Sequence, residues 1–346
     1  MKSTKVMTVL VSMAFSLGLA QELAFKVKVF DAETHLPLTN ATVRAGFQHR
    51  TYSWTEGVKS NPKFAKTSVD GIAEFRGDSN CGEVWCTIKD QSEYYKPQPV
   101  ILYGDKGEWK GVAVSMIRLF VPERWIVTND VRIVMRKMGN PIPLCAKWIE
   151  RWNENGLYPA GTNTVAYDLM QGDWLPPLGK GERADIELVH RRTERGEGRL
   201  YEWDKLQKIW RDEVEIRFTG EGNGLVGYVS DPSETLRIRT APETGFRPQH
   251  LVWADMDTKL KRQASDDNNL SFAFRIRTRR NERGEIVEAF YGKIYRNPKL
   301  LGGGGYPLNG FEMVYYLNPT PLDRNLEWDM KTNLCPDPGN LGERRP

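Results

Sequence analysis

The sequence predicts a mainly β protein made of two domains, and three observations lead to this prediction. Short runs of β-branched and aromatic residues recur along the chain and are bounded by Gly, Pro, Asn and Asp, as is typical of antiparallel strands. The 346 residues exceed what one small sandwich needs and suffice for two ordinary cores. A Pro- and Gly-rich segment, residues 138–143, is typical of a domain linker. We therefore expect an N-terminal β-sandwich, residues 22–137, and a second β-sandwich or jelly-roll-like domain with one or two short helices.

The composition excludes several classes of protein. Hydrophobic residues make up 40% of the chain and charged residues 27%, a balance that excludes a polytopic membrane protein. The 11 Trp, 13 Tyr and 13 Phe are too many aromatic side chains for a disordered chain. Lys and Arg outnumber Asp and Glu by only 49 to 45, so no basic excess indicates a nucleic-acid partner.

The first twenty residues have the pattern of a secretory signal peptide. Lys2 and Lys5 precede an apolar run, Val6–Leu19, which ends in small residues before Gln21. The run is shorter than the roughly 18 apolar residues that a membrane span needs, and no cysteine follows Ala20 to accept a lipid. We expect cleavage after Ala20, a secreted or periplasmic location, and no stable membrane span in the mature chain.

Four cysteines indicate disulfide bonds, because an even number in an exported chain is usually paired. They are Cys81, Cys86, Cys145 and Cys335. Three pairings are open, and we favour a short Cys81–Cys86 loop together with a Cys145–Cys335 bridge across the second domain. A bridge of that span stabilises the fold by about 5 kcal/mol when only chain entropy is considered.

The sequence contains no pattern of metal ligands. The four histidines are His35, His49, His190 and His250. None of them lies at zinc-ligand spacing from a cysteine pair, so we expect neither a metal nor another cofactor. The glycine-rich run Gly220–Gly224 connects two expected strands and lacks the Lys-Ser/Thr of a phosphate-binding loop, so we interpret it as a turn.

The first domain shows the alternation of half-buried strands. Lys26 and Lys28 alternate with hydrophobic residues in the run 25–29. A second alternating run covers 41–45, and a turn at 68–71 leads into a third. Further β-branched runs lie at 84–88, 112–120 and 131–135. Because no long helical pattern interrupts these runs, we expect this domain to be all-β.

Several short motifs in this domain follow the order and spacing of a known family. They are Val27-x-Val29-x-Asp31, Pro37-Leu38-x-x-Ala41-x-Val43, Thr67-x-x-Asp70-Gly71-x-Ala73-x-Phe75 and the pair Tyr94-Tyr95. Together they resemble the carboxypeptidase regulatory-like domain of the transthyretin-like sandwich group. The resemblance implies a seven-stranded Greek-key sandwich that is appended to secreted and outer-membrane proteins and is grouped with carbohydrate-binding-like folds. It implies no catalytic residues.

The second domain, expected over residues 144–335, begins with a pattern that predicts a short helix. Apolar residues recur there at i, i+1, i+4, i+5 and i+8, which places them on one face of a helix that ends before Gly156. They are Leu144, Cys145, Trp148, Ile149 and Trp152. Trp203, Leu206 and Trp210 allow a second short helix, although their surroundings are equally consistent with a hairpin.

The remainder of the second domain is predicted to be strands. Short branched or aromatic runs bounded by turn residues lie at 184–189, 214–218, 225–229, 236–239, 271–278, 286–295 and 311–316. The segment Asn281–Gly284 has a glycine where a hairpin turn needs positive φ. Residues 336–346 are expected to form a tail. The segments 167–181 and 315–321 resemble parts of an uncharacterised domain of secreted bacterial proteins, and this resemblance implies no function.

Basic residues alternate with apolar residues in one of these runs. The basic residues are Arg275, Arg277 and Arg279, and the apolar ones are Phe272, Phe274 and Ile276. A basic stripe can hold an anion, but alternation of this kind is first of all the solvated face of a two-sided sheet. We therefore expect the three arginines to face solvent.

Paired carboxylates are the feature that a polysaccharide hydrolase would need. Asp168 with Asp173, and Asp255 with Asp257, are candidate pairs. Because 45 acidic residues make such pairs common by chance, we expect them to be structural and assign no catalytic residue. A serine nucleophile is equally unsupported, since the chain has no G-x-S-x-G motif and His190 is expected at a strand end.

Aromatic residues in polar stretches are the main indication of a ligand. Trp54, Tyr94, Tyr95 and Trp109 lie in such stretches, and aromatic rings of this kind stack on sugar faces. We interpret them as a candidate glycan-binding platform. The sequence favours a non-catalytic binding or scaffold protein with polysaccharide or another cell-envelope component as its partner. Two alternatives stay open: a polysaccharide hydrolase with its site in the second domain, and a component of an envelope assembly.

Overall fold

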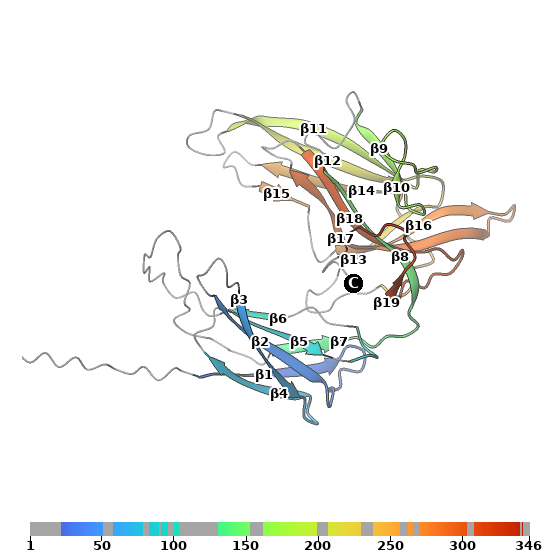
Figure 1. Ribbon diagram of the computed structural model, residues 1–346. Helices are drawn as coiled ribbons and strands as arrows, with labels where there is room; N and C mark the ends of the chain where they lie inside the picture. Colours follow the sequence, from blue (N-terminus) through green and yellow to red (C-terminus); the bar gives the residue numbers. More distant parts are fainter. Residues whose placement is uncertain are drawn as a thin grey trace, which may run out of the picture. The chain divides into compact units, whose positions relative to one another are not determined.

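The computed structural model describes residues 22–50, 58–78, 83–89, 91–95, 100–103, 131–152, 162–198, 207–229, 238–256, 262–265, 270–302, 308–339 and 341. Throughout these residues the regular secondary structure is β-strand (Figure 1), which confirms the expected mainly β fold. The chain divides after Lys137 into two compact units, residues 1–137 and 138–346. No part of the described chain forms a helix long and apolar enough to cross a membrane.

The first unit consists of two sheets that share one core. Its strands are β1 (Glu22–Asp31), β2 (Thr42–Arg50), β3 (Val58–Lys66), β4 (Ile72–Asp78), β5 (Glu83–Lys89), β6 (Val100–Tyr103) and β7 (Val131–Met135). A three-stranded sheet has the order β4-β1-β7, and a four-stranded sheet has the order β3-β2-β5-β6. Neighbouring strands are antiparallel except β1 and β7, which are parallel. The chain therefore crosses repeatedly between the sheets, as in a sandwich.

Strand alternation builds the core of the first unit. On β1, Val27 and Val29 are fully buried whereas Lys26 is exposed, which confirms the predicted alternation. The rings of Phe25 and Phe75 stack in the same core with 5.5 Å between their centroids. Residues from both sheets contribute to this one cluster, so the two sheets pack face to face.

The turn expected at residues 68–71 lies between β3 and β4. The N–H of Gly71 donates to the carbonyl oxygen of Ser68 at 3.0 Å, and Gly71 has a φ of +69°. A Cβ atom on Gly71 would lie 2.6 Å from the carbonyl oxygen of Val29. Both the backbone conformation and the close approach of β1 therefore require glycine at this position.

The second unit consists of two larger sheets. Its strands are β8 (Ile142–Trp152), β9 (Thr164–Asp168), β10 (Asp173–Trp174), β11 (Ile186–Gly198), β12 (Gln207–Phe218), β13 (Gly224–Val229), β14 (Gln249–Met256), β15 (Arg262–Ala264), β16 (Leu270–Arg280), β17 (Ile286–Gly302), β18 (Leu308–Asn318) and β19 (Trp328–Asn333). The β12 sheet is six-stranded with the order β10-β9-β11-β12-β14-β15. The β17 sheet is six-stranded with the order β13-β16-β17-β18-β8-β19.

The main core of the second unit lies between these two sheets. Val214 and Val252 come from the β12 sheet, and Phe274 and Phe311 come from the β17 sheet. All four are fully buried in one contiguous cluster, so the unit is a sandwich. Two smaller cores include alternate residues of β17 and β18, so the β17 sheet buries both of its faces.

The first segment predicted as a short helix is strand β8, so that prediction is wrong. Leu144 and Ala146 face one of the smaller cores, whereas Cys145 and Ile149 face the main core. Apolar residues lie on both faces of the strand, so no period of two is visible in the sequence. The spacing of the largest apolar residues then resembles that of one face of a helix. In the second ambiguous segment, Trp210 lies on β12 and pairs with β11, which matches the hairpin alternative.

The predicted linker is bound to the second unit. The two carboxylate oxygens of Glu327 accept hydrogen bonds from the N–H groups of Gly139 and Asn140, each at 2.7 Å. The side chain of Glu327 is buried, and β8 already begins at Ile142. A charged acceptor bound to two backbone donors makes a firm attachment. These residues therefore extend the second unit and are not a free spacer.

The described part of the predicted tail also packs on the second unit. The N–H of Trp148 donates to the carbonyl oxygen of Pro338 at 3.0 Å, and the ammonium of Lys147 lies 3.2 Å from a carboxylate oxygen of Asp337. Leu341 is buried in the same small core as Trp328. The chain thus contributes to the fold beyond the boundary at residue 335 that the sequence predicted.

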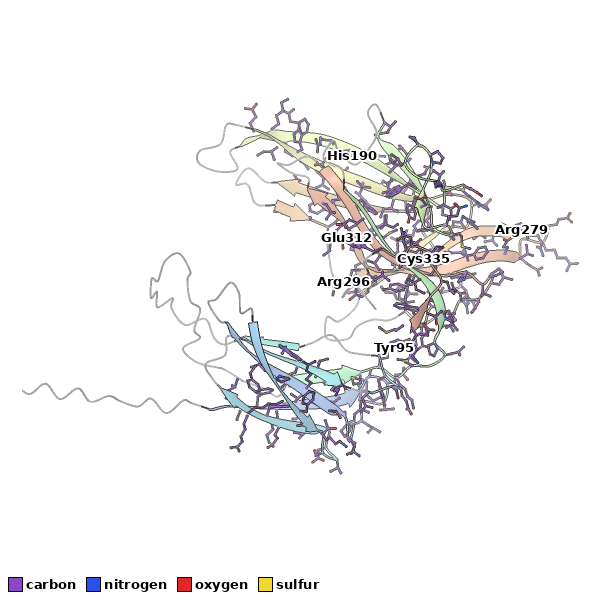
Figure 2. The ribbon with its side chains drawn as sticks, viewed as in Figure 1. Tyr95, His190, Arg279, Arg296, Glu312 and Cys335 are labelled. Carbon is purple, nitrogen blue, oxygen red and sulfur yellow. The ribbon has the colours of Figure 1, made fainter. Side chains whose placement is uncertain are left out.

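An irregularity in β16 contradicts the expected solvated face of arginines. Arg275 is 5% exposed, and its guanidinium donates to the carbonyl oxygen of Gly222. Arg277 has a φ of +54°, and the register with β17 shifts just before Arg279. The three arginines therefore have different surroundings, and of the three it is Arg279 that is exposed to solvent, toward the outer end of the hairpin (Figure 2).

Candidate binding site

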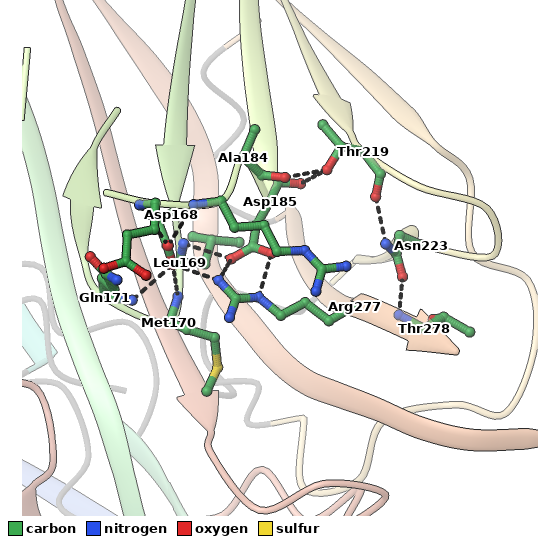
Figure 3. Close-up of polar contacts among 12 residues, drawn as sticks. Asp168, Leu169, Met170, Gln171, Ala184, Asp185, Thr219, Asn223, Arg277 and Thr278 are labelled. Atoms are coloured by element: carbon green, nitrogen blue, oxygen red, sulfur yellow. Dashed lines mark hydrogen bonds and ion pairs between the residues drawn. The ribbon is translucent and has the colours of Figure 1, made fainter. Parts of the chain in front are cut away.

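A buried cluster in the second unit joins two carboxylates and one arginine, Asp168, Asp185 and Arg277 (Figure 3). The Nη2 atom of Arg277 lies 2.7 Å from Oδ1 of Asp168, and its Nε atom lies 2.9 Å from Oδ1 of Asp185. Asp168 and Asp185 are 1% and 2% exposed. Burial raises the pKa of Asp185, although the hydrogen bond from Arg277 opposes this rise. The cluster connects the end of β9 with β16 of the other sheet.

Backbone amides bind the same carboxylates. Oδ1 of Asp168 accepts from the N–H groups of Met170 and Gln171 at 3.0 and 2.9 Å. Oδ2 of Asp185 accepts from the N–H of Leu169 at 2.9 Å (Figure 3). Buried polar groups with this many partners hold a loop in place and are poorly suited to proton transfer to a substrate. We assign this cluster to the fold.

Asp173, the predicted partner of Asp168 in a hydrolase pair, also binds backbone amides. Its Oδ1 accepts from the N–H of Trp174 and its Oδ2 accepts from the N–H of Lys180, each at 2.8 Å. The two carboxylates shape the loops on either side of β10. Their contacts favour the structural interpretation over a catalytic one.

The second predicted acid pair is described only in part. Asp255 lies 3.3 Å from a guanidinium nitrogen of Arg195 and 3.2 Å from one of Arg211. The guanidinium of Arg211 also lies over the ring of Trp253, 4.5 Å from its centroid. Asp257 lies outside the described residues. Asp255 is thus part of a network of ion pairs and cation–π contacts on the β12 sheet.

A further polar cluster lies on β11 and β12. Nε2 of His190 (Figure 2) and Nε of Arg192 each lie 2.8 Å from Oδ1 of Asp212, which is fully buried. Burial alone would raise the pKa of Asp212, but the hydrogen bonds from His190 and Arg192 outweigh it and hold this pKa below its usual value. Asp212 is therefore ionised at neutral pH and links the two strands.

Three of the four cysteines lie among the described residues, and all three are buried thiols. The side chains of Cys145 and Cys335 are hydrogen bonded to each other in the main core. This bond, together with burial, raises the pKa of Cys145, whereas the same bond and nearby Lys147 lower the pKa of Cys335 to about 7. Cys81 lies outside the described residues, so its pairing with Cys86 stays a prediction.

The feature best suited to a ligand is a cavity of about 370 Å³ between β13, β14 and β16. Its apolar wall consists of Leu225, Val226, Leu270 and Phe272. Its polar side chains are Arg247, Gln249 and His250. Elsewhere among the described residues, no group of three His, Cys, Asp or Glu side chains is arranged to hold a metal ion. The cavity therefore offers binding through apolar contact and a few polar groups.

His250 is held in one orientation beside the apolar wall. Its Nε2 atom lies 2.8 Å from Oδ1 of Asn297, and its ring centroid lies 4.6 Å from that of Phe272. Because the amide nitrogen of Asn297 donates to the carbonyl oxygen of Ser265, its Oδ1 acts as the acceptor and Nε2 of His250 carries the proton. Burial lowers the pKa of His250, so the ring is neutral at pH 7.

The main chain holds Arg247 at the edge of the cavity. Its N–H and carbonyl groups exchange hydrogen bonds with Leu225 at 3.0 and 2.9 Å. Gly224, with a φ of +152°, permits this approach, since a Cβ atom there would collide with the carbonyl group of Arg247. Arg247 is exposed, and its guanidinium forms no ion pair with any acid in the described part of the chain.

The residues of the predicted glycan platform have different surroundings. Tyr95 is 4% exposed, so its ring is not available to a sugar and its assignment to the platform is wrong. Tyr94 packs against the core of the first unit, and its hydroxyl group is hydrogen bonded to Asp31. Trp54 and Trp109 lie outside the described residues. The platform hypothesis therefore depends on these two tryptophans.

The cavity residues were not predicted from the sequence. In the sequence, His250 is a candidate only for a zinc ligand, and Arg247 has no motif around it. The sequence feature next to these residues is Pro248. Because proline has no N–H group to donate to a strand ladder, Pro248 separates Arg247 from β14. Nothing in the spacing connects residues 225–227 with 247–250, because the site forms only where strands of two sheets approach each other.

Comparisons with known proteins identify no family for this chain. No protein-family model matches it, and no curated protein matches it. Among solved structures, the full-length major pilin SpaD from Corynebacterium diphtheriae is similar over 89% of this chain and 84% of that chain, with 9% sequence identity and a TM-score of 0.22. A TM-score this low does not establish a common fold, so the function has to be inferred from the residues themselves.

Proposed function

We propose that this protein is an exported, non-catalytic binding protein whose ligand site is the cavity between β13, β14 and β16. One observation carries the proposal: an apolar cavity lies beside Arg247, whose guanidinium has no ion-pair partner among the described residues. Small-molecule sites typically enclose about 300–1,000 Å³, with apolar walls and a few fixed polar groups. At about 370 Å³, this cavity falls within that range.

The chemistry of the cavity favours binding over hydrolysis. Glycoside hydrolysis needs two carboxylates on either side of the scissile bond. The described residues that line the cavity include neither Asp nor Glu. The buried carboxylates Asp168 and Asp185 are bound by Arg277 and by backbone amides. These contacts support a site that holds a ligand without transforming it.

A cavity-filling variant tests the proposed site. A Cβ atom on Gly227 would lie 3.4 Å from Leu270 and 3.5 Å from Phe272, so Gly227→Val directs its methyl groups toward the apolar wall. The full chain and this variant are titrated with small sugars, carboxylates, alcohols and amines, and binding is followed by NMR chemical shifts. We expect shifts at cavity residues in the unaltered protein and their loss in the variant. A complete absence of bound compound in the unaltered protein would falsify the proposal.

Export is proposed from the signal-peptide pattern of residues 1–20. Amino-terminal sequencing of the protein recovered from the periplasm or medium of a bacterial host tests it. The mature chain is expected to begin at Gln21. Recovery of the unprocessed chain from the cytosol alone would contradict export.

We also propose that the first unit is a carboxypeptidase regulatory-like module that binds carbohydrate. The three-stranded and four-stranded sheets of the described residues support this, because together they have the seven strands that the resemblance implies. Trp54 and Trp109 are the candidate stacking residues. A pull-down on soluble and insoluble polysaccharides, with release of reducing sugar measured in the same tubes, tests the proposal.

Binding without sugar release, lost in Trp54→Ala or Trp109→Ala, is the expected result of this pull-down. Release of sugar would favour the hydrolase alternative instead. If neither binding nor release occurs, the carbohydrate proposal is wrong. Light scattering over a concentration series then tests whether the chain assembles with itself.

A further inference from the structure

We infer that the cavity binds a small amphiphile that has a single anionic head group and an apolar body. This inference rests on the proposed binding function and specifies the ligand class of the same site. The head group is a carboxylate, sulfonate or phosphate monoester that pairs with Arg247. The body occupies the space between Leu225, Leu270 and Phe272.

The size of the cavity limits the ligand. A volume of about 370 Å³ corresponds to roughly a dozen molecules of liquid water, at about 30 Å³ each. Because water and a methylene group have similar sizes, the part of the ligand that lies inside the cavity has on the order of a dozen non-hydrogen atoms. A short acyl chain or a single aromatic ring with a short side chain fits this limit, whereas a polysaccharide chain does not.

The walls of the cavity favour an apolar body. Leu225 and Phe272 belong to the main core and are almost fully buried, and Leu270 packs against that core. Gly227 lies opposite Phe272 in the β13–β16 register and adds no side chain to fill the space. His250 is neutral at pH 7 because burial lowers its pKa, so its ring adds no charge to these walls. An apolar ligand gains most from such a surface.

The charge at the edge of the cavity favours an anionic head group. Arg247 is exposed and has no ion pair among the described residues, although its main chain is held by Leu225. Glu243, an acid in the same connecting segment, is paired with Arg324 at 3.2 Å. The guanidinium of Arg247 therefore keeps its donors available, and its planar fork suits the two oxygen atoms of a carboxylate.

Three ligands of one shape and different charge test the inference. They are 4-phenylbutyrate, 4-phenyl-1-butanol and 4-phenylbutylamine, which share an aromatic body and differ in the head group. Isothermal titration calorimetry at pH 7 measures their dissociation constants for the full chain and for three variants. Arg247→Gln removes the charge, Gly227→Val fills the cavity, and Arg279→Gln removes an exposed charge elsewhere on the second unit.

We expect 4-phenylbutyrate to bind at least tenfold more tightly than the alcohol, and the amine to bind most weakly. Arg247→Gln should weaken binding of the carboxylate about tenfold and leave the alcohol unchanged, whereas Arg279→Gln should change neither. Gly227→Val should abolish binding of all three ligands.

Two results would overturn the inference, and they have different consequences for the proposed function. Equal affinity for the carboxylate and the alcohol, lost in Gly227→Val, would show that the cavity binds ligands but does not select anions. The proposed function would then stand and the anionic ligand class would be wrong. No binding of any of the three ligands to the unaltered protein would overturn the ligand class, and the wider ligand panel would then decide the proposed function. The comparison of ligands on the unaltered protein does not depend on whether a variant folds.

Discussion

The Nη2 atom of Arg277 lies 2.7 Å from Oδ1 of Asp168, although 109 positions separate the two residues in the chain. The contact joins β16 of one sheet of the second unit to the end of β9 in the other sheet. Arg277 also binds the neighbouring carboxyl group of Asp185. Burial raises the pKa of that group, and the hydrogen bond from Arg277 opposes the rise. The backbone of Arg277 has a φ of +54°, a conformation that costs an L-residue about 1–2 kcal/mol. The hydrogen bonds of its guanidinium to Asp168 and Asp185 hold Arg277 in this conformation.

Replacing Arg277 with Met is expected to destabilise the second unit by about 3–5 kcal/mol, because two buried carboxylates then remain without their cation. Equilibrium unfolding in urea measures the loss. Arg279→Met is a matched control on the same strand, where the side chain is 71% exposed, and its effect should stay below about 0.5 kcal/mol. Similar losses in the two variants would show that the buried cluster has no special role.

Asp212 should make the stability of the protein depend on pH in the acid range. Its pKa is below the usual value because His190 and Arg192 outweigh the effect of burial. The stabilisation is therefore present above the unfolded-state pKa of about 3.9 and is lost as the pH falls through the lower folded-state pKa. The free energies of unfolding of the unaltered protein and of Asp212→Asn should differ by a constant amount well above the unfolded-state pKa and should approach each other as the pH falls below it. Urea titrations at a series of pH values measure both, and a constant difference down to pH 2 would contradict this linkage.

The predictability of each strand from sequence depends on how many of its faces are buried. On β1, Lys26 faces solvent while Val27 and Val29 face the core, so the period of two is visible in the sequence. On β8, Leu144 and Cys145 are successive residues that face two different cores. Because apolar residues lie on both faces of β8, no period of two is visible, and the pattern resembles that of a helix.

The candidate site could not be predicted from the sequence for a related reason. Arg247 becomes a candidate partner for an anionic head group only because its main chain is held beside Leu225 and its guanidinium has no acid partner in the described part of the chain. Arg277 is also an arginine and lies in an alternating run, but its guanidinium forms ion pairs with two buried carboxylates. The difference between the two arginines arises from long-range contacts, which a local pattern does not contain.

Glu327 should protect the start of the second unit from hydrogen exchange. Its two carboxylate oxygens each accept one backbone N–H, from Gly139 and Asn140 at 2.7 Å. Glu327→Gln keeps one acceptor and loses the charge, and a hydrogen bond to a charged group contributes about 1.5–3 kcal/mol. We expect amide exchange at residues 139 and 140 to become at least tenfold faster, while exchange in β1 of the first unit stays the same. Unchanged exchange at both amides would mean that the contact with Glu327 does not hold this segment.

Cys145 and Cys335 are predicted to form a disulfide bond in an oxidising compartment. Their side chains are hydrogen bonded in the main core, and the N–H of Leu334 donates to the carbonyl oxygen of Leu144 at 3.0 Å, so the two chain segments already lie side by side. The hydrogen bond with Cys145 and nearby Lys147 lower the pKa of Cys335, which favours the thiolate that disulfide formation needs. Closing a loop of this length stabilises the folded state by about 5 kcal/mol if chain entropy dominates.

Peptide mapping without reduction is expected to recover one linked pair of peptides that contains Cys145 and Cys335. Reduction should then lower the melting temperature of the unaltered protein, because the unfolded chain regains the freedom that the bridge removes. The double variant Cys145→Ser, Cys335→Ser should melt at the same temperature with and without reductant, whereas Cys86→Ser should keep the response to reductant. Alkylation of both residues without prior reduction, in protein purified from an oxidising compartment, would show that this pair stays reduced and that the second unit is stabilised by its core alone.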